Sequence, residues 1–264
     1  MMTGIGRQDG PHAVKAALFD FDGTLSTLRQ GWEAVMEPYM VEVLVAAGLD
    51  AAQARLQVHQ YVDASTGIQT YRQMEWLAAR VSEREAPLDP WQYKREYNRR
   101  LMLPVKERIR QITSGACTPE DYLVPGSLSL LQALRDMGVV LYLASGTDHA
   151  DVERESVLLG VRSFFREVAG APPGVTDCSK ETVLRQLLEG QGLRGGELVV
   201  VGDGRVEIAL GREAGARTIG VASDETGRQP FNRHKEARLR KAGADWIIGD
   251  FRDTPGIVSW LCEA

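Results

Sequence analysis

Cysteine and long apolar runs are scarce in this sequence of 264 residues. Its three cysteines are far apart and form no CxxC pair, so we expect neither a disulfide framework nor a structural zinc site. No apolar run reaches the ~18 residues of a membrane span, and the first fifteen residues lack the apolar stretch of a secretory signal. We therefore expect a cytoplasmic protein without a membrane partner. The cysteines are Cys117, Cys178 and Cys262.

An excess of positive charge is also missing. The chain has 31 basic and 36 acidic residues, a net charge of −5, which gives no overall attraction to nucleic acid or to an anionic membrane. Between Asp89 and Arg110 basic residues outnumber acidic ones and aromatic residues are interleaved, but solvated helix faces are the commoner cause. We expect no nucleic-acid partner. Apolar residues make up 44% of the chain, close to the globular average, so a folded core is expected.

Short apolar runs predict the strands of a parallel sheet. They lie at 13–19, 139–144, 198–201, 216–221 and 245–248, with a weaker run at 164–169. Helical patterns that end at glycine lie between them, at 128–137, 152–159, 180–188 and 208–214. Strand and helix in alternation are typical of right-handed βαβ units, so we predict an α/β fold with a parallel sheet.

The stretch from residue 26 to residue 118 has no clear strand. Helical patterns occupy 32–44, 51–64, 68–81 and 88–112, and Pro104 is predicted to kink or split the last of them. We predict a helical domain of residues 26–118, inserted into a discontinuous α/β domain formed by residues 1–25 and 119–264. The alternative is an all-helical continuation of one domain.

The strongest chemical motif, DxDGT, follows the first apolar run. It begins at Asp20 and contains Asp22 and Gly23. With each residue type at roughly one in twenty, it arises by chance in about one of 160,000 windows. Two carboxylates at the carboxyl end of a strand can share one ligand site, and glycine allows the backbone to approach a ligand closely.

Three weaker motifs follow later strands. Ser145 and Gly146 open a helix, whose N–H groups can bind an anion, although a serine there is usually only an N-cap. Lys180 begins a helix, where a cation is not favoured; a solvated surface lysine is the alternative. Asp203 and Glu207 suit a divalent cation with oxygen ligands, or an N-cap with a capping-box glutamate.

The order of these motifs, DxDGT, serine, lysine and GDxxxE, resembles that of the haloacid dehalogenase (HAD) superfamily of phosphotransferases. The helical insertion resembles the C1 cap of its phosphoglycolate phosphatase and β-phosphoglucomutase-like members, by position and helical character. This resemblance spans roughly residues 13–261 and implies a Rossmann-like parallel sheet that carries a mobile helical cap.

The resemblance also implies roles for the acidic residues. Asp20 would attack phosphorus and form an aspartyl-phosphate, and Asp22 would protonate the leaving oxygen and then deprotonate water. Mg²⁺ would be held by the Asp20 carboxylate, the Asp22 carbonyl and Asp203. Glu207 would belong to the metal site by holding a metal-bound water, or would hold Lys180.

Phosphate binding is implied for Thr24, Ser145, Gly146 and Lys180, with the lysine offsetting the developing charge. Substrate choice is expected from the segment after the motif. There Arg29 could pair with an anionic or hydroxyl-rich substrate, and an exposed arginine is the alternative.

Trp32, in the same segment, could stack on a ring of the substrate. The alternative is a tryptophan that packs between helices. Both residues are candidates from their position after the nucleophile alone.

The function that this resemblance implies is a Mg²⁺-dependent phosphatase acting on a small phosphorylated metabolite, a sugar phosphate or a similar phosphomonoester. Asp22 disfavours dehalogenases and phosphonatases, which lack this second aspartate. A phosphomutase of the same superfamily and a non-catalytic phosphate-binding module are the alternatives. The sequence does not indicate an oligomeric state.

Overall fold

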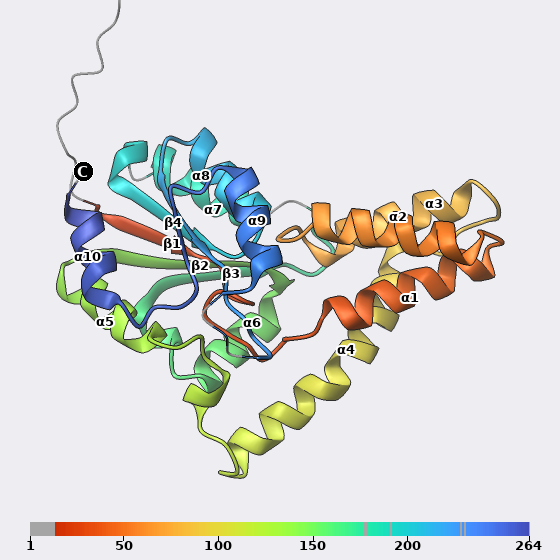
Figure 1. Ribbon diagram of the computed structural model, residues 1–264, viewed down its shortest axis with the longest axis horizontal. Helices are drawn as coiled ribbons and strands as arrows, with labels where there is room; N and C mark the ends of the chain where they lie inside the picture. The colour runs from red at the N-terminus through yellow and green to blue at the C-terminus, as the bar shows by residue number, and fades with distance from the viewer. Residues whose placement is uncertain (1–13, 177–178, 191, 228, 230, 264) are drawn as a thin grey trace, which may run out of the picture.

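A parallel sheet of six strands forms the centre of the computed structural model (Figure 1), which describes residues 14–176, 179–190, 192–227, 229 and 231–263. The strand order is β3-β2-β1-β4-β5-β6, and every neighbouring pair is parallel. This is the Rossmann order, so the predicted α/β fold is confirmed. The strands are β1 (Ala16–Phe19), β2 (Val140–Asp148), β3 (Phe165–Ala171), β4 (Leu198–Gly202), β5 (Arg217–Val221) and β6 (Trp246–Ile248).

The strands are continuously apolar because helices cover both faces of the sheet. In β1, Ala17 and Phe19 belong to one hydrophobic cluster, while Ala16 and Leu18 belong to another. The first cluster takes apolar residues from α5 (Ser127–Asp136), α6 (His149–Leu158) and α10 (Thr254–Cys262). The second takes them from α7 (Ser179–Arg185) and α8 (Arg205–Glu213), and α9 (Arg233–Ala242) packs beside α8.

Four helices between β1 and β2 form what we call the helical region, residues 33–113. They have a hydrophobic cluster of their own, which includes Met40, Leu77 and Val105 and shares no member with the clusters of the sheet. Figure 1 shows them projecting to one side of the sheet. The division into two domains at residues 26 and 118 stays a prediction. The helices are α1 (Glu33–Ala46), α2 (Ala51–Ala64), α3 (Thr70–Ser82) and α4 (Pro90–Thr113).

Helix α4 runs unbroken across Pro104, so of the two predicted outcomes the split is wrong, while the kink stays a prediction. A proline inside a helix costs about 3 kcal/mol, because a hydrogen bond is lost and the ring crowds the preceding turn. Leu101 and Val105, on either side of Pro104, are buried in the cluster of the helical region. Their packing keeps the segment helical despite the proline.

The structure bears on the expectations about cysteines and membrane spans only for the residues that it describes. Cys117 and Cys262 are free thiols, and Cys178 lies outside the described residues. Within the described ranges, no helix is both long and apolar enough to cross a membrane.

Replacing Pro104 with alanine should stabilise the protein, because it restores a backbone N–H that can bond to the carbonyl of Arg100. We expect the free energy of unfolding to rise by about 2 kcal/mol: the ~3 kcal/mol helix penalty is removed, and up to ~1 kcal/mol is lost through a more flexible unfolded chain. Urea denaturation measures the difference. Leu103→Ala, at a neighbouring exposed position, is the control and should change stability by less than ~0.5 kcal/mol. A less stable Pro104→Ala variant would contradict this account.

Candidate active site

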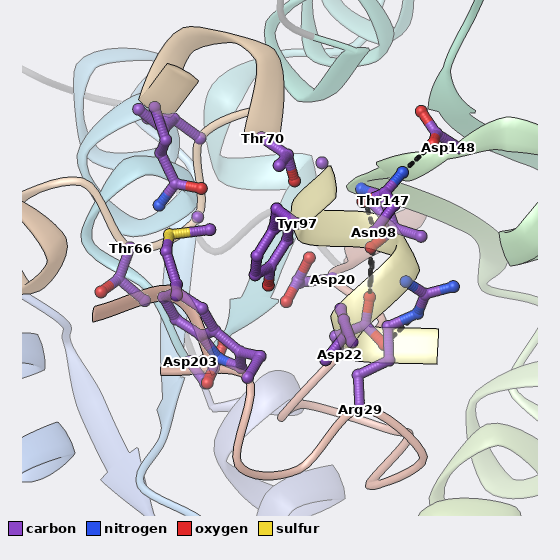
Figure 2. Close-up of a pocket in the computed structure, with 18 of the residues that line it drawn as sticks. Asp20, Asp22, Arg29, Thr66, Thr70, Tyr97, Asn98, Thr147, Asp148 and Asp203 are labelled. Atoms are coloured by element: carbon purple, nitrogen blue, oxygen red, sulfur yellow. Dashed lines mark hydrogen bonds and ion pairs between the residues drawn. The ribbon is translucent and has the colours of Figure 1, made fainter. Parts of the chain in front are cut away.

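The predicted site residues meet at the carboxyl ends of the central strands. Asp20 directly follows β1, Asp203 directly follows β4, and Ser145 lies in the last part of β2. Because the strand order reverses between β1 and β4, the connections leave the sheet in opposite directions there and open a crevice. Asp20, Ser145 and Asp203 line one cavity together with Lys180 of α7. Figure 2 shows Asp20 and Asp203 in this cavity.

Lys180 joins two carboxylates in the interior of this site. Its Nζ lies 2.8 Å from Oδ1 of Asp20 and 3.0 Å from Oε2 of Glu207. Burial opposes its charge, but the carboxylates of Asp20 and Glu207 outweigh burial and raise the pKa of Lys180. Lys180 is therefore a buried cation, and not the solvated lysine of the alternative interpretation.

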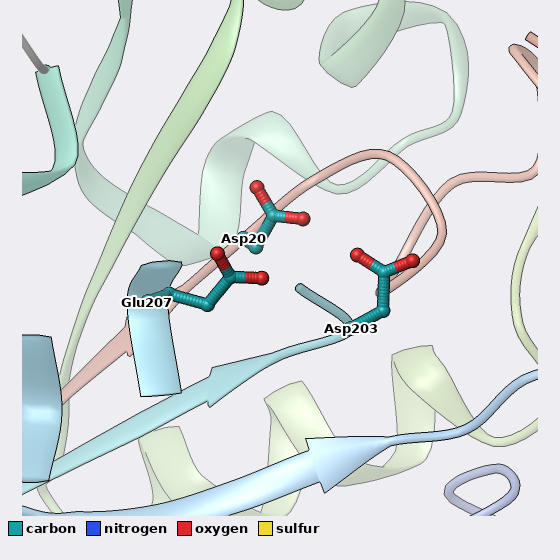
Figure 3. A group of neighbouring side chains, drawn as sticks. All are labelled: Asp20, Asp203 and Glu207. Atoms are coloured by element: carbon teal, nitrogen blue, oxygen red, sulfur yellow. The ribbon is translucent and has the colours of Figure 1, made fainter. Parts of the chain in front are cut away.

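Three buried carboxylates form a potential metal site. Asp20, Asp203 and Glu207 each offer an oxygen within 4.8 Å of the others, and Figure 3 shows the three groups around a common space. Burial raises the pKa of Asp20 well above its usual value; Lys180 lowers it, while Glu207 and Asp203 raise it further. The cluster is thus short of positive charge, which a divalent cation with oxygen ligands would supply.

The hydrogen bonds of Glu207 indicate which carboxylates are available to such an ion. One oxygen of Glu207 contacts Lys180, and the other accepts the N–H of Gly204 at 2.5 Å. In Asp203, Oδ2 contacts the ammonium of Lys235, while Oδ1 has no partner among the described residues. Asp203 therefore fits the metal better than Glu207, whose contacts favour the second predicted role, that of holding Lys180.

Lys235 is a site residue that the sequence analysis missed. This buried residue of α9 extends its Nζ to 2.7 Å from Oδ2 of Asp203, 2.5 Å from Oε1 of Glu225 and 3.2 Å from Oγ of Ser223. The Ser223 hydroxyl donates to the carbonyl of Gly23 in the DxDGT loop at 2.5 Å. A lysine within a run of charged residues reads as a surface residue, so no local signal identifies it.

Asp22 faces the cavity between neutral donors and a cation. Its Oδ2 accepts hydrogen bonds from the hydroxyls of Thr147 at 2.8 Å and Ser145 at 3.4 Å. Its Oδ1 is buried, accepts no hydrogen bond from the described residues and lies 3.9 Å from Nε of Arg29. Burial raises the pKa of Asp22 to about 6, and Arg29 opposes the shift. A carboxyl group in this range can both give and take a proton near neutral pH.

Thr24 and Gly146 occupy different positions relative to the cavity. Thr24 is fully buried and donates its hydroxyl to Oδ2 of Asp20 at 3.2 Å, but it does not line the cavity. Gly146 lines it, and a Cβ there would lie 2.7 Å from the carbonyl oxygen of Ile68. The loop between α2 and α3 therefore approaches the core where only a glycine fits.

Arg29 and Trp32 both line the cavity, as their position after the nucleophile predicts. Arg29 is not the exposed arginine of the alternative: its guanidinium donates to both oxygens of Glu155 at 2.6 and 3.1 Å and to Asp151 at 2.9 Å. Trp32 is partly buried against the cluster of the helical region, so it packs between helices as well as facing the cavity.

The helical region adds lining residues that the sequence analysis did not select. Tyr97 and Asn98 come from α4, Thr70 comes from the start of α3, and Thr66 precedes it. Figure 2 shows them around the same cavity as Asp20 and Asp22, with Asn98 beside Asp148 at the end of β2. In the sequence, such residues cannot be told from ordinary helix positions, because only the tertiary structure brings them to the cavity.

Comparisons with known proteins agree with the motifs. A family model described as haloacid dehalogenase-like hydrolase matches residues 14–215. A phosphoglycolate phosphatase of Synechococcus elongatus is 26% identical over 235 residues, which are 89% of this chain and 92% of the relative.

Solved structures share the fold. A predicted phosphoglycolate phosphatase from Haemophilus somnus has a TM-score of 0.58 at 21% identity, over 94% of this chain and 99% of that one. A β-phosphoglucomutase from Clostridium difficile has a TM-score of 0.60 at 14% identity, over 91% and 92%. Together with the family model, these likenesses confirm the resemblance seen in the motifs.

Removing the ammonium of Lys235 should destabilise the protein, because Asp203 and Glu225 would then be buried without their shared cation. We expect Lys235→Met to lower the free energy of unfolding by about 3–5 kcal/mol, measured by urea denaturation in the presence of EDTA. The double variant Glu225→Gln/Lys235→Met should recover part of the loss, since it leaves one buried carboxylate fewer. Lys241→Met, at an exposed position of α9, is the matched control. Equal stability of the Lys235 and Lys241 variants would contradict this account.

Proposed function

The chain belongs to the haloacid dehalogenase-like hydrolase family, and we propose that it is a Mg²⁺-dependent phosphatase acting on a small phosphorylated metabolite. The observation that carries the proposal is the buried contact of Lys180 with Asp20 and Glu207, beside Asp203. A phosphate ester is anionic and repels an anionic nucleophile, so the site must combine a carboxylate with positive charge. The curated relatives named phosphoglycolate phosphatases support phosphatase chemistry.

The reaction has two steps in this proposal. First, a carboxylate oxygen of Asp20 forms a bond to phosphorus while the ester P–O bond breaks, and Asp22 gives its proton to the departing alcohol oxygen. Second, Asp22 takes a proton from water, the water oxygen bonds to phosphorus, and the bond to Asp20 breaks. Inorganic phosphate leaves, and both carboxyl groups return to their starting states.

The surrounding residues hold the reacting groups. Lys180 balances the charge on Asp20 and on the phosphoryl oxygens, and Glu207 keeps the lysine in place. Ser145 and Gly146, which line the cavity, bind phosphoryl oxygens. Thr24 acts on phosphate binding through its hydrogen bond to Asp20.

Mg²⁺ would be held by the Asp20 carboxylate, the Asp22 carbonyl and Asp203, with Glu207 acting through Lys180. When bound, it neutralises charge and orients the phosphate. A cytoplasmic location belongs to the same proposal, supported by Cys117 and Cys262, which are free thiols.

Residues 26–118 are proposed to act as a cap domain over the core formed by residues 1–25 and 119–264. Two observations support this: the separate hydrophobic cluster of the helical region, and the approach of its α2–α3 loop to the core. The guanidinium Nε of Arg72 also donates to the carbonyl of Thr176 at 3.0 Å, across the boundary. Closure of such a cap excludes water from the reacting phosphoryl group.

The nucleophile is tested by Asp20→Asn, which should lower kcat for phosphate release by about a thousandfold or more, because an amide does not form the phosphoenzyme. Activity should also vanish with EDTA and return with Mg²⁺. Phosphate release from a panel of phosphomonoesters measures both. Asp50→Asn is the matched control, since Asp50 caps α2 away from the site and asparagine is an equally good N-cap.

Activity that persists in Asp20→Asn or in EDTA would contradict the proposal. Isomerisation of a sugar phosphate without net phosphate release would indicate a phosphomutase. Ligand binding without a phosphoenzyme would indicate a non-catalytic module.

The approach of the helical region to the core is tested by Gly67→Ala. Gly67 has a φ of +95°, and a Cβ there would lie 2.6 Å from Oε2 of Glu207, the oxygen that contacts Lys180. Gly48 has a φ of +88° in the same region, but its Cβ would meet no described atom within 4 Å. Both alanine variants should lose ~1–2 kcal/mol of stability through backbone strain, and Gly67→Ala should lose more, because its Cβ also displaces Glu207. Only Gly67→Ala should also lower kcat/KM, by about tenfold; equal kcat/KM in the two variants would count against the cap proposal.

A further inference from the structure

The hydroxyl of Tyr97 is an unused hydrogen-bond donor inside the cavity. The side chain is only 3% exposed, and no described residue forms a hydrogen bond with its hydroxyl. Figure 2 shows the ring entering the cavity from α4, with the hydroxyl directed toward the side of Asp20. Burial raises the pKa of Tyr97, so the phenol keeps its proton and remains a donor. The hydroxyl is not one of the fully buried atoms that lack a partner, so it is open to the cavity, where a ligand can supply an acceptor for it.

The wall around Tyr97 is neutral apart from Arg29 and Asp22, whose charges act on the Tyr97 hydroxyl. Within the described chain, the lining residues from 32 to 101 carry no charge, and the polar ones offer hydroxyl or amide groups. Asn98 is held in place by donating its amide to Oδ2 of Asp148 at 3.0 Å, and Thr70 adds a hydroxyl. Such a wall recognises hydroxyl groups, which both donate and accept hydrogen bonds.

The cations near the cavity are already matched by carboxylates. Arg29 is paired with Glu155 and Asp151, and Lys94 of α4 is paired with Asp148. Lys180 belongs to the phosphate side of the site, where it contacts Asp20. A second anionic group on the substrate would therefore lose its hydration without gaining an unpaired cation among the described residues, which is unfavourable.

We propose, on the basis of the phosphatase function above, that the alcohol part of the substrate is neutral and hydroxylated, as in a polyol or sugar phosphate, and that Tyr97 is a specificity residue that donates a hydrogen bond to one of its oxygens. Esters whose alcohol part carries a carboxylate are poor substrates. Phosphoglycolate, which gives the curated relatives their name, is such an ester.

Three two-carbon esters test the substrate class: ethyl phosphate, 2-hydroxyethyl phosphate and phosphoglycolate. They differ only in the terminal methyl, hydroxymethyl or carboxylate group. We expect kcat/KM for the hydroxyethyl ester to exceed that for the ethyl ester by roughly two- to tenfold, the range of one hydrogen bond. Phosphoglycolate should be slower than the hydroxyethyl ester by at least about tenfold. Glycerol 3-phosphate and 3-phosphoglycerate repeat the comparison with three carbons; a preference for the carboxylate ester in both pairs would overturn the proposed class.

Tyr97→Phe tests the residue. The preference for the hydroxyethyl over the ethyl ester should fall toward one, while a merely structural role would lower both rates equally and leave the ratio unchanged. Tyr93→Phe is the matched control on the same helix: the hydroxyl of Tyr93 accepts the N–H of Leu88 at 3.2 Å, and Tyr93 does not line the cavity. An unchanged ratio in Tyr97→Phe would overturn the role of Tyr97.

Failure of the proposed function can be told from failure of this inference. If none of these esters nor p-nitrophenyl phosphate releases phosphate, the phosphatase proposal fails. Calorimetric binding of the same esters to Asp20→Asn with Mg²⁺ then decides the substrate class without turnover. Tighter binding of the hydroxylated esters would support the inference, and tighter binding of the carboxylate esters would overturn it.

Discussion

The contact of Lys180 with Asp20 and Glu207 connects the end of β1 with helices α7 and α8, and the candidate site is organised around it. All three side chains are buried, so their charges have lost most of their contact with water. Removing water from charges is unfavourable unless each one has close partners, and an apolar trio of the same size would serve stability as well or better. The arrangement is therefore better explained by chemistry than by folding: it holds a carboxylate and a cation ready at one point in space.

The fold makes this arrangement possible because it brings loops from distant parts of the chain to the same edge of the sheet. Residues 20, 145 and 203 each belong to the end of a strand, and the three strands are neighbours in the sheet. The sequence could predict this convergence because each motif directly follows an apolar run. The local sequence therefore places each residue at the carboxyl end of its strand. Because the strands are parallel, these ends lie at the same edge of the sheet.

Residues that reach the site from the faces of helices could not be predicted in the same way. Lys235 lies on α9, where few apolar residues mark a buried side, and Tyr97 looks like any aromatic residue at helical spacing. The partner of Arg29, Glu155, is 126 residues away in the sequence. Such contacts depend on how the helices and strands pack against one another, and no short sequence pattern predicts them. The unbroken α4 at Pro104 has the same origin, since tertiary packing outweighs the local preference of proline.

The two sides of the cavity differ in the interactions that they offer to a ligand: charge on one side and hydrogen bonds on the other. In the proposed reaction, Lys180 on the strand side would attract the anionic phosphoryl group by its charge. On the helical side, where Arg29 is held by Glu155 and Asp151, the wall presents neutral hydroxyl and amide groups. Discrimination by hydrogen bonds is sharper than discrimination by apolar contact, because a ligand that lacks the right group leaves a buried polar atom unpaired. In this proposal, one side of the site would bind the phosphate and the other would select the alcohol. Exchange of a few residues in the helical region would then change the substrate while the core and its reaction stay the same.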